Sequence, residues 1–181
     1  MGWKLNGPLP PNMSTHCVVI AAPHTSNWDL PIAAALFYTQ GIKIRFTIKK
    51  EWMFFPMGLI LGALGAIPID RSPKKSGDAR LSTVEAMINL FKENEQLVLL
   101  VPPEASRSLR EEWKTGFYHV AKGANVPIGF GYINYATKIG GIDVVMDLSN
   151  DMEADMKKIM TYYQNIKGKF PEKFSVDKRY I

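Results

Sequence analysis

The chain has 181 residues, 46% of them hydrophobic, and a formal net charge of +5. These values fit a single globular domain over residues 1–181. The positive charge suits acidic partners such as phospholipid headgroups or nucleic acid, without choosing between them. The single cysteine, Cys17, excludes an intramolecular disulfide framework and suits a reducing compartment, so we expect a cytoplasmic protein. The most apolar stretch, residues 54–69, is interrupted by prolines and glycines and is shorter than the roughly 20 residues of a membrane-spanning helix.

Short apolar runs alternate with amphipathic stretches along the chain. The apolar runs predict strands at residues 17–22, 43–48, 66–69, 97–101, 128–134 and 140–147. The amphipathic stretches predict helices at residues 30–40, 78–93, 115–123 and 151–166. Pro56 and Gly58 split residues 51–64 into two short helical or irregular pieces, and Pro68 indicates a sheet edge or a strand end for the third strand. This alternation predicts an α/β fold with a largely parallel central sheet flanked by helices.

The sharpest local signal is a histidine and an aspartate that follow the first predicted strand, His24 and Asp29. An alcohol becomes a good nucleophile when a base takes its proton, and an imidazole does this near neutral pH if a carboxylate holds its other nitrogen. His24 and Asp29 could form such a pair if His24 lies in the turn and Asp29 in the first turn of the next helix. This segment alone fits equally well a loop histidine and a helix-capping aspartate. His16 and His119 have no acid at the same spacing, and we assign them to strand entry and helix packing.

Polar side chains also follow two other predicted strands. Arg71 comes directly after the third strand and could bind a phosphate in a bidentate manner, although a solvated ion pair with Asp70 explains the same residues. After the fourth strand, Glu104, Ser106 and Arg107 lie close together in the sequence. Hydroxyl and guanidinium groups suit a phosphate, and the carboxylate could orient the arginines.

These segments, in this order, resemble the four motifs of the glycerolipid acyltransferase family, typified by the 1-acylglycerol-3-phosphate acyltransferases. The family's His-x4-Asp motif matches residues 24–29, and its Gly-x-Ile-x-Ile-Asp-Arg motif matches residues 65–71. The third motif, usually Pro-Glu-Gly-Thr-Arg-Ser, corresponds to residues 103–108, and the fourth, Val-Pro-Ile, to residues 126–128. The resemblance covers residues 18–132, and four ordered motifs are far more specific than any one of them.

The resemblance implies transfer of a fatty acyl group from a thioester donor, acyl-ACP (acyl carrier protein) or acyl-CoA, to the free hydroxyl of a lysophospholipid. The acceptor that it implies first is 1-acylglycerol-3-phosphate, which would give phosphatidic acid. It implies that His24 is the general base and that Asp29 orients it, with no metal or redox cofactor. The residues implied for the acceptor-phosphate site are Arg71, Glu104, Ser106 and Arg107. We expect backbone N–H groups of the His24 turn to stabilise the oxyanion of the reaction.

The third motif departs from the family at Ala105 and Ser106, which replace the usual glycine and threonine. A methyl group at position 105 restricts the backbone conformations open to the loop. The same chemistry on another lyso-lipid, for example an amino-acid lipid, therefore stays open. A non-catalytic lipid-binding homologue is a second alternative, against which the intact His24 and Asp29 argue. We expect no nucleic-acid partner, because only the positive charge supports one.

A membrane-facing surface is predicted where basic residues precede aromatic ones. The basic residues are Lys43, Arg45, Lys49 and Lys50, and the aromatic ones are Trp52, Phe54 and Phe55. This composition suits anionic lipid surfaces, so we expect a peripheral protein at the inner face of the membrane. A solvated strand edge followed by a core helix, or a lining for the acyl-chain tunnel, explains the same residues.

Overall fold

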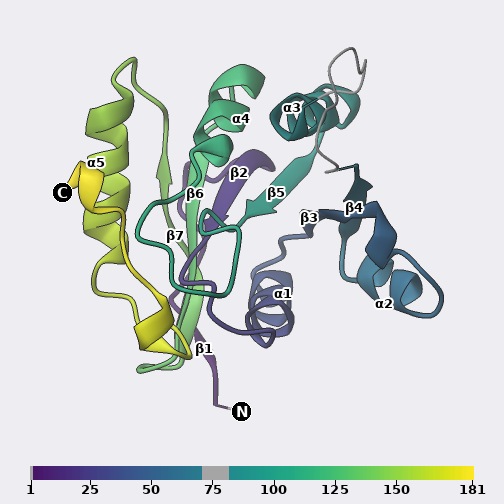
Figure 1. The fold of residues 1–181 in the computed structure, drawn as a ribbon, viewed down its shortest axis with the longest axis horizontal. Coiled ribbons are helices and arrows are strands. Elements are labelled where there is room, and N and C mark those ends of the chain that lie inside the picture. Colours follow the sequence, from purple (N-terminus) through teal and green to yellow (C-terminus); the bar gives the residue numbers. More distant parts are fainter. Residues whose placement is uncertain (1, 71–81) are drawn as a thin grey trace.

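The computed structural model describes residues 2–70 and 82–181, and within them a seven-stranded sheet carries helices on both faces (Figure 1). The strands are β1 Lys4–Leu5, β2 His16–Ala21, β3 Ile44–Lys49, β4 Ala66–Ile69, β5 Leu97–Val101, β6 Ile128–Asn134 and β7 Ile139–Met146. The α-helices are α1 Asp29–Thr39, α2 Met57–Ala63, α3 Thr83–Glu93, α4 Gly116–Ala124 and α5 Met152–Tyr163. Short 3-10 turns occur at η1 Lys50–Trp52, η2 Pro171–Lys173 and η3 Lys178–Tyr180.

The strand order is β1-β7-β6-β2-β5-β3-β4, and neighbouring strands are parallel except for β6 and β7. Because β1 is parallel to β7, these two strands run against the rest of the described sheet. The predicted α/β class with a largely parallel sheet is therefore confirmed. Strand β4 lies at the sheet edge, one of the two positions that Pro68 indicated.

The central strands are apolar throughout because both of their faces are covered by helices. Along β2, Val18 and Ile20 join the core that α3, α4 and α5 form with one face of the sheet. Cys17 and Val19 point the other way, into the core beneath α1. Cys17 is fully buried, as expected for a core residue, and this burial raises the pKa of its thiol to about 12. The thiol therefore stays protonated and is a poor nucleophile.

Element boundaries differ from the predictions by a few residues. Helix α3 begins after Ser82, whose side chain forms a capping box with Glu85, and residues 78–81 of the predicted helix lie outside the described residues. Strand β1 was not predicted, because two residues near prolines carry no periodic signal. His16 enters β2 as predicted, with Nε2 lying 3.1 Å from the Phe91 carbonyl oxygen. The packing role assigned to His119 was wrong, because its side chain is exposed on α4.

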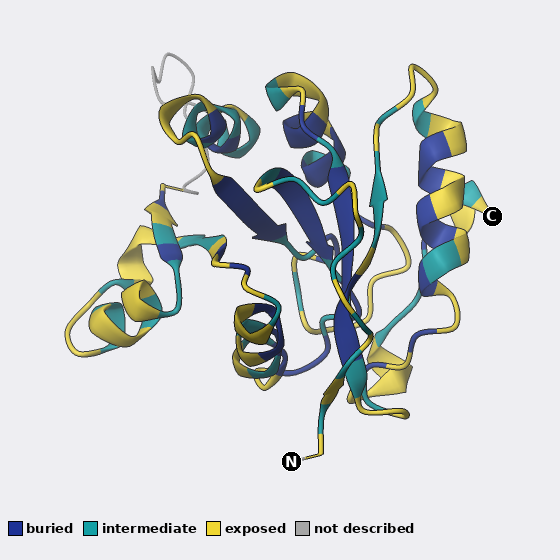
Figure 2. Ribbon diagram, turned by 180° about the vertical axis from the view of Figure 1, so that it is seen from behind, coloured by how far each residue is buried: buried dark blue, intermediate teal, exposed yellow. Residues whose placement is uncertain are grey.

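Residues 50–63 form an excursion between β3 and β4 that contributes no buried side chain. The predicted split into two short pieces is confirmed, since η1 and α2 are separate and Pro56 precedes α2. Figure 2 shows α2 as mostly exposed, at the outer side of the sheet beside its edge strand β4. A core helix, one of the explanations for this sequence, is therefore ruled out. None of the described helices is long and apolar enough to span a bilayer.

Candidate active site

The His24 turn, residues 22–28, lies at the carboxyl end of β2 and leads into α1 (Figure 1). Strands β5 and β6 flank β2 in parallel, so the segments that follow these three strands meet at the carboxyl end of the sheet. Open α/β sheets place their ligand sites at the carboxyl ends of their strands. The third motif follows β5 and therefore lies next to the His24 turn.

His24 and Asp29 contact each other directly. The imidazole Nδ1 lies 3.2 Å from Asp29 Oδ2, and Asp29 is the first residue of α1. The aspartate is 5% exposed, whereas the imidazole is only partly covered. A carboxylate at Nδ1 leaves Nε2 as the nitrogen that can accept a proton. The arrangement in which His24 lies in the turn and Asp29 in the first helical turn is thus the one observed.

The carboxylate of Asp29 also holds the turn in shape. Its Oδ2 accepts hydrogen bonds from the N–H groups of Thr25 and Ser26, each at 2.8 Å. Its Oδ1 accepts one from the hydroxyl of Tyr135 at 2.9 Å. Buried carboxylates need such donors, because an unpaired charge away from water is costly. Both oxygens of Asp29 are therefore fixed before any substrate binds.

Tyr135 was missed by the sequence analysis, although a signal was available. It follows β6 directly, at the same carboxyl end of the sheet as the His24 turn, and it carries a hydroxyl. Burial, followed by the charge of Asp29 and the hydrogen bond to it, raises the pKa of Tyr135 above its usual value. The phenol therefore remains a proton donor to Asp29 at neutral pH.

Glu104 joins the third motif to the first. Its Oε1 accepts a hydrogen bond from the His24 N–H at 2.8 Å, and its side chain is buried. The second oxygen, Oε2, is buried and has no hydrogen-bond partner among the described residues. Burial raises the pKa of Glu104 to about 7, against the lowering effect of the His24 N–H. The carboxyl group thus positions the His24 backbone rather than standing open to a phosphate.

The rest of the third motif forms a tight exposed loop. Ala105 has a left-handed backbone with φ of 52°, a region that glycine enters at lower cost. The alanine therefore keeps the backbone shape that glycine would favour. Ser106 Oγ accepts a hydrogen bond from the Ser108 N–H at 2.9 Å, and Arg107 is exposed.

A pocket of about 350 Å³ opens beside the His24 turn. Residues 25–28 form one part of its lining. The other part is formed by Arg107, Lys169, Phe170 and Lys173. The lining places three cations beside the histidine turn. The last three residues belong to a C-terminal segment that the sequence analysis did not connect with the site.

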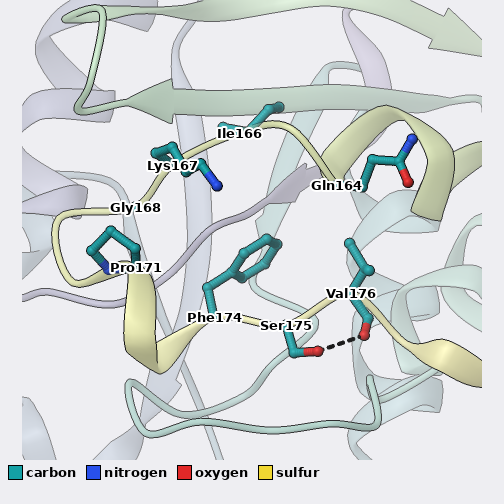
Figure 3. Close-up of a pocket in the computed structure, with 8 residues that line it drawn as sticks. All are labelled: Gln164, Ile166, Lys167, Gly168, Pro171, Phe174, Ser175 and Val176. Atoms are coloured by element: carbon teal, nitrogen blue, oxygen red, sulfur yellow. Dashed lines mark hydrogen bonds between the residues drawn. The ribbon is translucent and has the colours of Figure 1, made fainter.

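A second pocket, of about 200 Å³, lies against the same C-terminal segment (Figure 3). It is lined by Gln164, Ile166, Lys167, Gly168, Pro171, Phe174, Ser175 and Val176. None of the described residues of the four motifs lines this pocket. The two pockets share no residue, so Lys167 belongs to one and its neighbours Lys169 and Lys173 to the other.

The remaining motif residues are not brought together in the described structure. Arg71 lies outside the described residues, and β4, which precedes it, is separated from β5 by β3. The fourth motif lies at the start of β6, where the Val18 N–H donates to the Pro127 carbonyl oxygen. That is the opposite end of β2 from His24, so this motif supports the sheet. Within residues 2–70 and 82–181, no group of three or more metal-ligating side chains is placed to hold a metal ion.

The sequence matches the protein-family model described as Acyltransferase over residues 9–129, which is well over half of the chain. The chain belongs to the acyltransferase family. This confirms the family resemblance drawn from the four motifs. The acyltransferase also has a fold similar to the crystal structure of the 1-acyl-sn-glycerophosphate (LPA) acyltransferase PlsC from Thermotoga maritima. The TM-score is 0.61 with 16% sequence identity, over 88% of this chain and 68% of that chain. None of the curated proteins is significantly similar in sequence.

Replacing Glu104 by glutamine should change how the stability of the acyltransferase depends on pH. The carboxyl pKa of Glu104 is raised in the folded state. The contribution of Glu104 to the free energy of unfolding is therefore fully present below about pH 4.5 and is lost as the pH rises through about 7. Glutamine still offers an oxygen to the His24 N–H but cannot ionise. The free energy of unfolding of the parent, relative to Glu104→Gln, should therefore fall by up to about 3 kcal/mol between about pH 4.5 and 8. Urea denaturation across this range measures it, and a difference that does not vary with pH would contradict it.

Replacing Ala105 by glycine should stabilise the acyltransferase by roughly 1 kcal/mol, because glycine adopts the left-handed conformation without the steric cost of a Cβ. The matched control is Ala35→Gly, at an exposed position within α1, which should destabilise by roughly 0.5–1 kcal/mol. Thermal unfolding of the two variants gives the comparison. Destabilisation by both changes to the same extent would show that the loop does not hold this conformation in solution.

Proposed function

We propose that this acyltransferase moves a fatty acyl group from acyl-ACP or acyl-CoA to the free hydroxyl of 1-acylglycerol-3-phosphate, giving phosphatidic acid. The observation that carries the proposal is the contact of His24 with the buried Asp29 beside a pocket lined by cations. The structural similarity to an LPA acyltransferase agrees with this acceptor. No metal or redox cofactor enters the proposed reaction.

In the proposed reaction, Nε2 of His24 takes the proton of the acceptor hydroxyl as its oxygen attacks the thioester carbonyl. Asp29 stabilises the imidazolium through Nδ1, and its remaining hydrogen bonds keep it from turning away. The tetrahedral intermediate then collapses, the carbon–sulfur bond breaks, and the imidazolium returns the proton to the thiolate. No acyl-enzyme forms, in keeping with the buried, protonated Cys17.

The oxyanion of the intermediate needs hydrogen-bond donors, which we expected from backbone N–H groups of the His24 turn. Most of these groups already donate elsewhere. The His24 N–H donates to Glu104, and the Trp28 N–H donates to Ser26 Oγ at 3.2 Å. The N–H groups of residues 25 and 26 hold Asp29. The backbone N–H of Asn27 makes no hydrogen bond with the described residues, and Asn27 lines the pocket. We therefore propose this N–H group as an oxyanion donor.

The alternatives have less support than this acceptor. A different lyso-lipid was suggested by Ala105, but the left-handed backbone there is the conformation that glycine favours. A non-catalytic lipid-binding homologue would not need a carboxylate fixed by three separate donors behind the histidine. The first observation favours a phosphate-bearing acceptor, and the second favours catalysis.

We also propose that the enzyme binds the inner face of the membrane peripherally, through the excursion between β3 and β4. Its large apolar side chains are exposed: Trp52, Phe54, Phe55, Leu59 and Ile60, with Phe55 84% exposed. The basic residues Lys43, Arg45, Lys49 and Lys50 are also exposed. Apolar side chains that enter the lipid and cations that meet anionic headgroups together favour a membrane surface.

The first experiment is acyl transfer from a labelled thioester to lysophosphatidic acid. His24→Ala removes the base and should lower kcat/KM on the order of 100-fold or more. His119→Ala is the matched control, because that histidine is exposed on α4 and should leave the rate unchanged. An equally active His24→Ala variant would overturn the mechanism. A parent enzyme that acylates only lyso-lipids without phosphate would overturn the acceptor.

Flotation with vesicles tests the membrane surface. The parent should float with vesicles that contain anionic lipid. The triple variant Phe54→Ser/Phe55→Ser/Leu59→Ser should bind at least about tenfold more weakly, because each lost side chain removes apolar area that the lipid would cover on binding. Tyr38→Ser, which changes a 74% exposed aromatic residue on α1, is the control and should float like the parent. Equal flotation of the triple variant would argue against this surface.

A further inference from the structure

The C-terminal segment, residues 164–181, returns from α5 to the His24 turn. In Figure 1 it is the yellow part of the chain, which turns back beside α5. The Phe170 N–H donates to Thr25 Oγ1 at 3.3 Å, and the Tyr135 N–H donates to the Lys167 carbonyl oxygen at 2.9 Å. The match to the acyltransferase family ends at residue 129, before this segment begins.

The segment is held tightly where it touches the site. A Cβ at Gly168 would lie only 2.8 Å from Thr25 Oγ1, so the chain passes the turn where no larger residue fits. Further along, the buried Asp177 accepts a hydrogen bond from the Trp113 N–H at 2.9 Å, and Trp113 Nε1 donates to the Ser175 carbonyl oxygen at 2.9 Å. The segment is therefore anchored on both sides of residues 169–173.

Anchoring places two lysines opposite the His24 turn. Lys169 Nζ lies 5.8 Å from the centre of the Trp28 ring, and Lys173 Nζ lies 4.5 Å from the centre of the Phe170 ring. Aromatic faces attract ammonium groups without neutralising their charge. Neither lysine forms an ion pair with a described residue. Both ammonium groups thus remain available to a ligand.

The charges around this pocket favour an anion. Arg107, Lys169 and Lys173 line it, and among the described residues no acidic side chain does. The two carboxylates of the His24 site are already engaged or covered: Asp29 accepts hydrogen bonds on both oxygens, and Glu104 is buried. Glu172, beside Lys173 in η2, is exposed and does not line the pocket. A guanidinium and two ammonium groups that line the same pocket suit a phosphate, which offers several acceptor oxygens.

We propose that Lys169 and Lys173, together with Arg107, bind the phosphate of the acceptor headgroup. The C-terminal segment thereby helps to determine acceptor specificity. This inference rests on the proposed function, since it assigns the acceptor's phosphate to the pocket beside His24. The lysines act by binding and orientation, and they leave proton transfer to the histidine. A lysophosphatidate bound this way has its headgroup fixed while its hydroxyl faces the base.

Steady-state kinetics of Lys169→Gln/Lys173→Gln test the proposal. The KM for lysophosphatidic acid should rise about tenfold or more, with little change in kcat or in the KM for the donor. The effect should shrink at high salt, which screens partly exposed charges. With uncharged monoacylglycerol as acceptor, parent and variant should be equal. Lys167→Gln is the matched control, because that lysine lines the other pocket, and Lys169→Arg/Lys173→Arg should restore the low KM.

An unchanged KM for lysophosphatidic acid would overturn the proposal, and so would a rise confined to the KM for the donor, which would assign the cations to donor phosphates. Calorimetric titration with sn-glycerol 3-phosphate separates this test from the proposed function, because binding needs no turnover. If the parent acylates no phosphate-bearing lipid, the proposed function fails. Tenfold weaker binding by the double glutamine variant, but not by Lys167→Gln, would still support the anion pocket. Equal binding by all three proteins would contradict it.

Discussion

The geometry of the site depends on one buried carboxylate. Asp29 is 5% exposed and accepts hydrogen bonds from two backbone amides, a tyrosine hydroxyl and the Nδ1 side of His24. A buried charge is tolerated only when donors surround it, so the turn cannot relax without leaving that charge unpaired. The same set of bonds fixes the backbone of residues 25 and 26 and the orientation of the imidazole. The same hydrogen bonds to Asp29 therefore stabilise the fold of the turn and orient the base.

The parallel arrangement of β2, β5 and β6 brings the partners of this carboxylate together. Glu104 follows β5 and holds the His24 N–H, while Tyr135 follows β6 and holds Asp29. Each contact joins segments that follow directly neighbouring strands. The helices on both faces bury the central strands, and this burial removes water from the base of the site. Hydrogen bonds to charged groups are stronger in such an environment, which keeps the turn rigid.

The outer wall of the pocket has a different origin. Residues 169–173 come from beyond the part of the chain that matches the acyltransferase family. Hydrogen bonds to Thr25 and Tyr135 on one side, and to Trp113 on the other, hold them at the His24 turn. The pair of His24 and Asp29 therefore lies within the part of the chain that matches the family, and the two lysines lie outside it. The exposed aromatic residues before and within α2 form a separate surface, whose function does not depend on this wall.

The sequence by itself determined the α/β class and most strands and helices, and the resemblance carried by its four ordered motifs implied the pairing of His24 with Asp29. These features follow from local patterns: period-two and helical spacing, proline and glycine breaks, and polar residues after apolar strands. Tertiary structure alone decided that Tyr135 completes the shell around Asp29, that Glu104 is turned inward, and that Lys169 and Lys173 face the turn. Those residues are separated from residues 24–29 by long stretches of sequence, and their side-chain directions depend on packing. Burial and long-range hydrogen bonds leave no periodic trace in a single sequence, so only the folded chain reveals them.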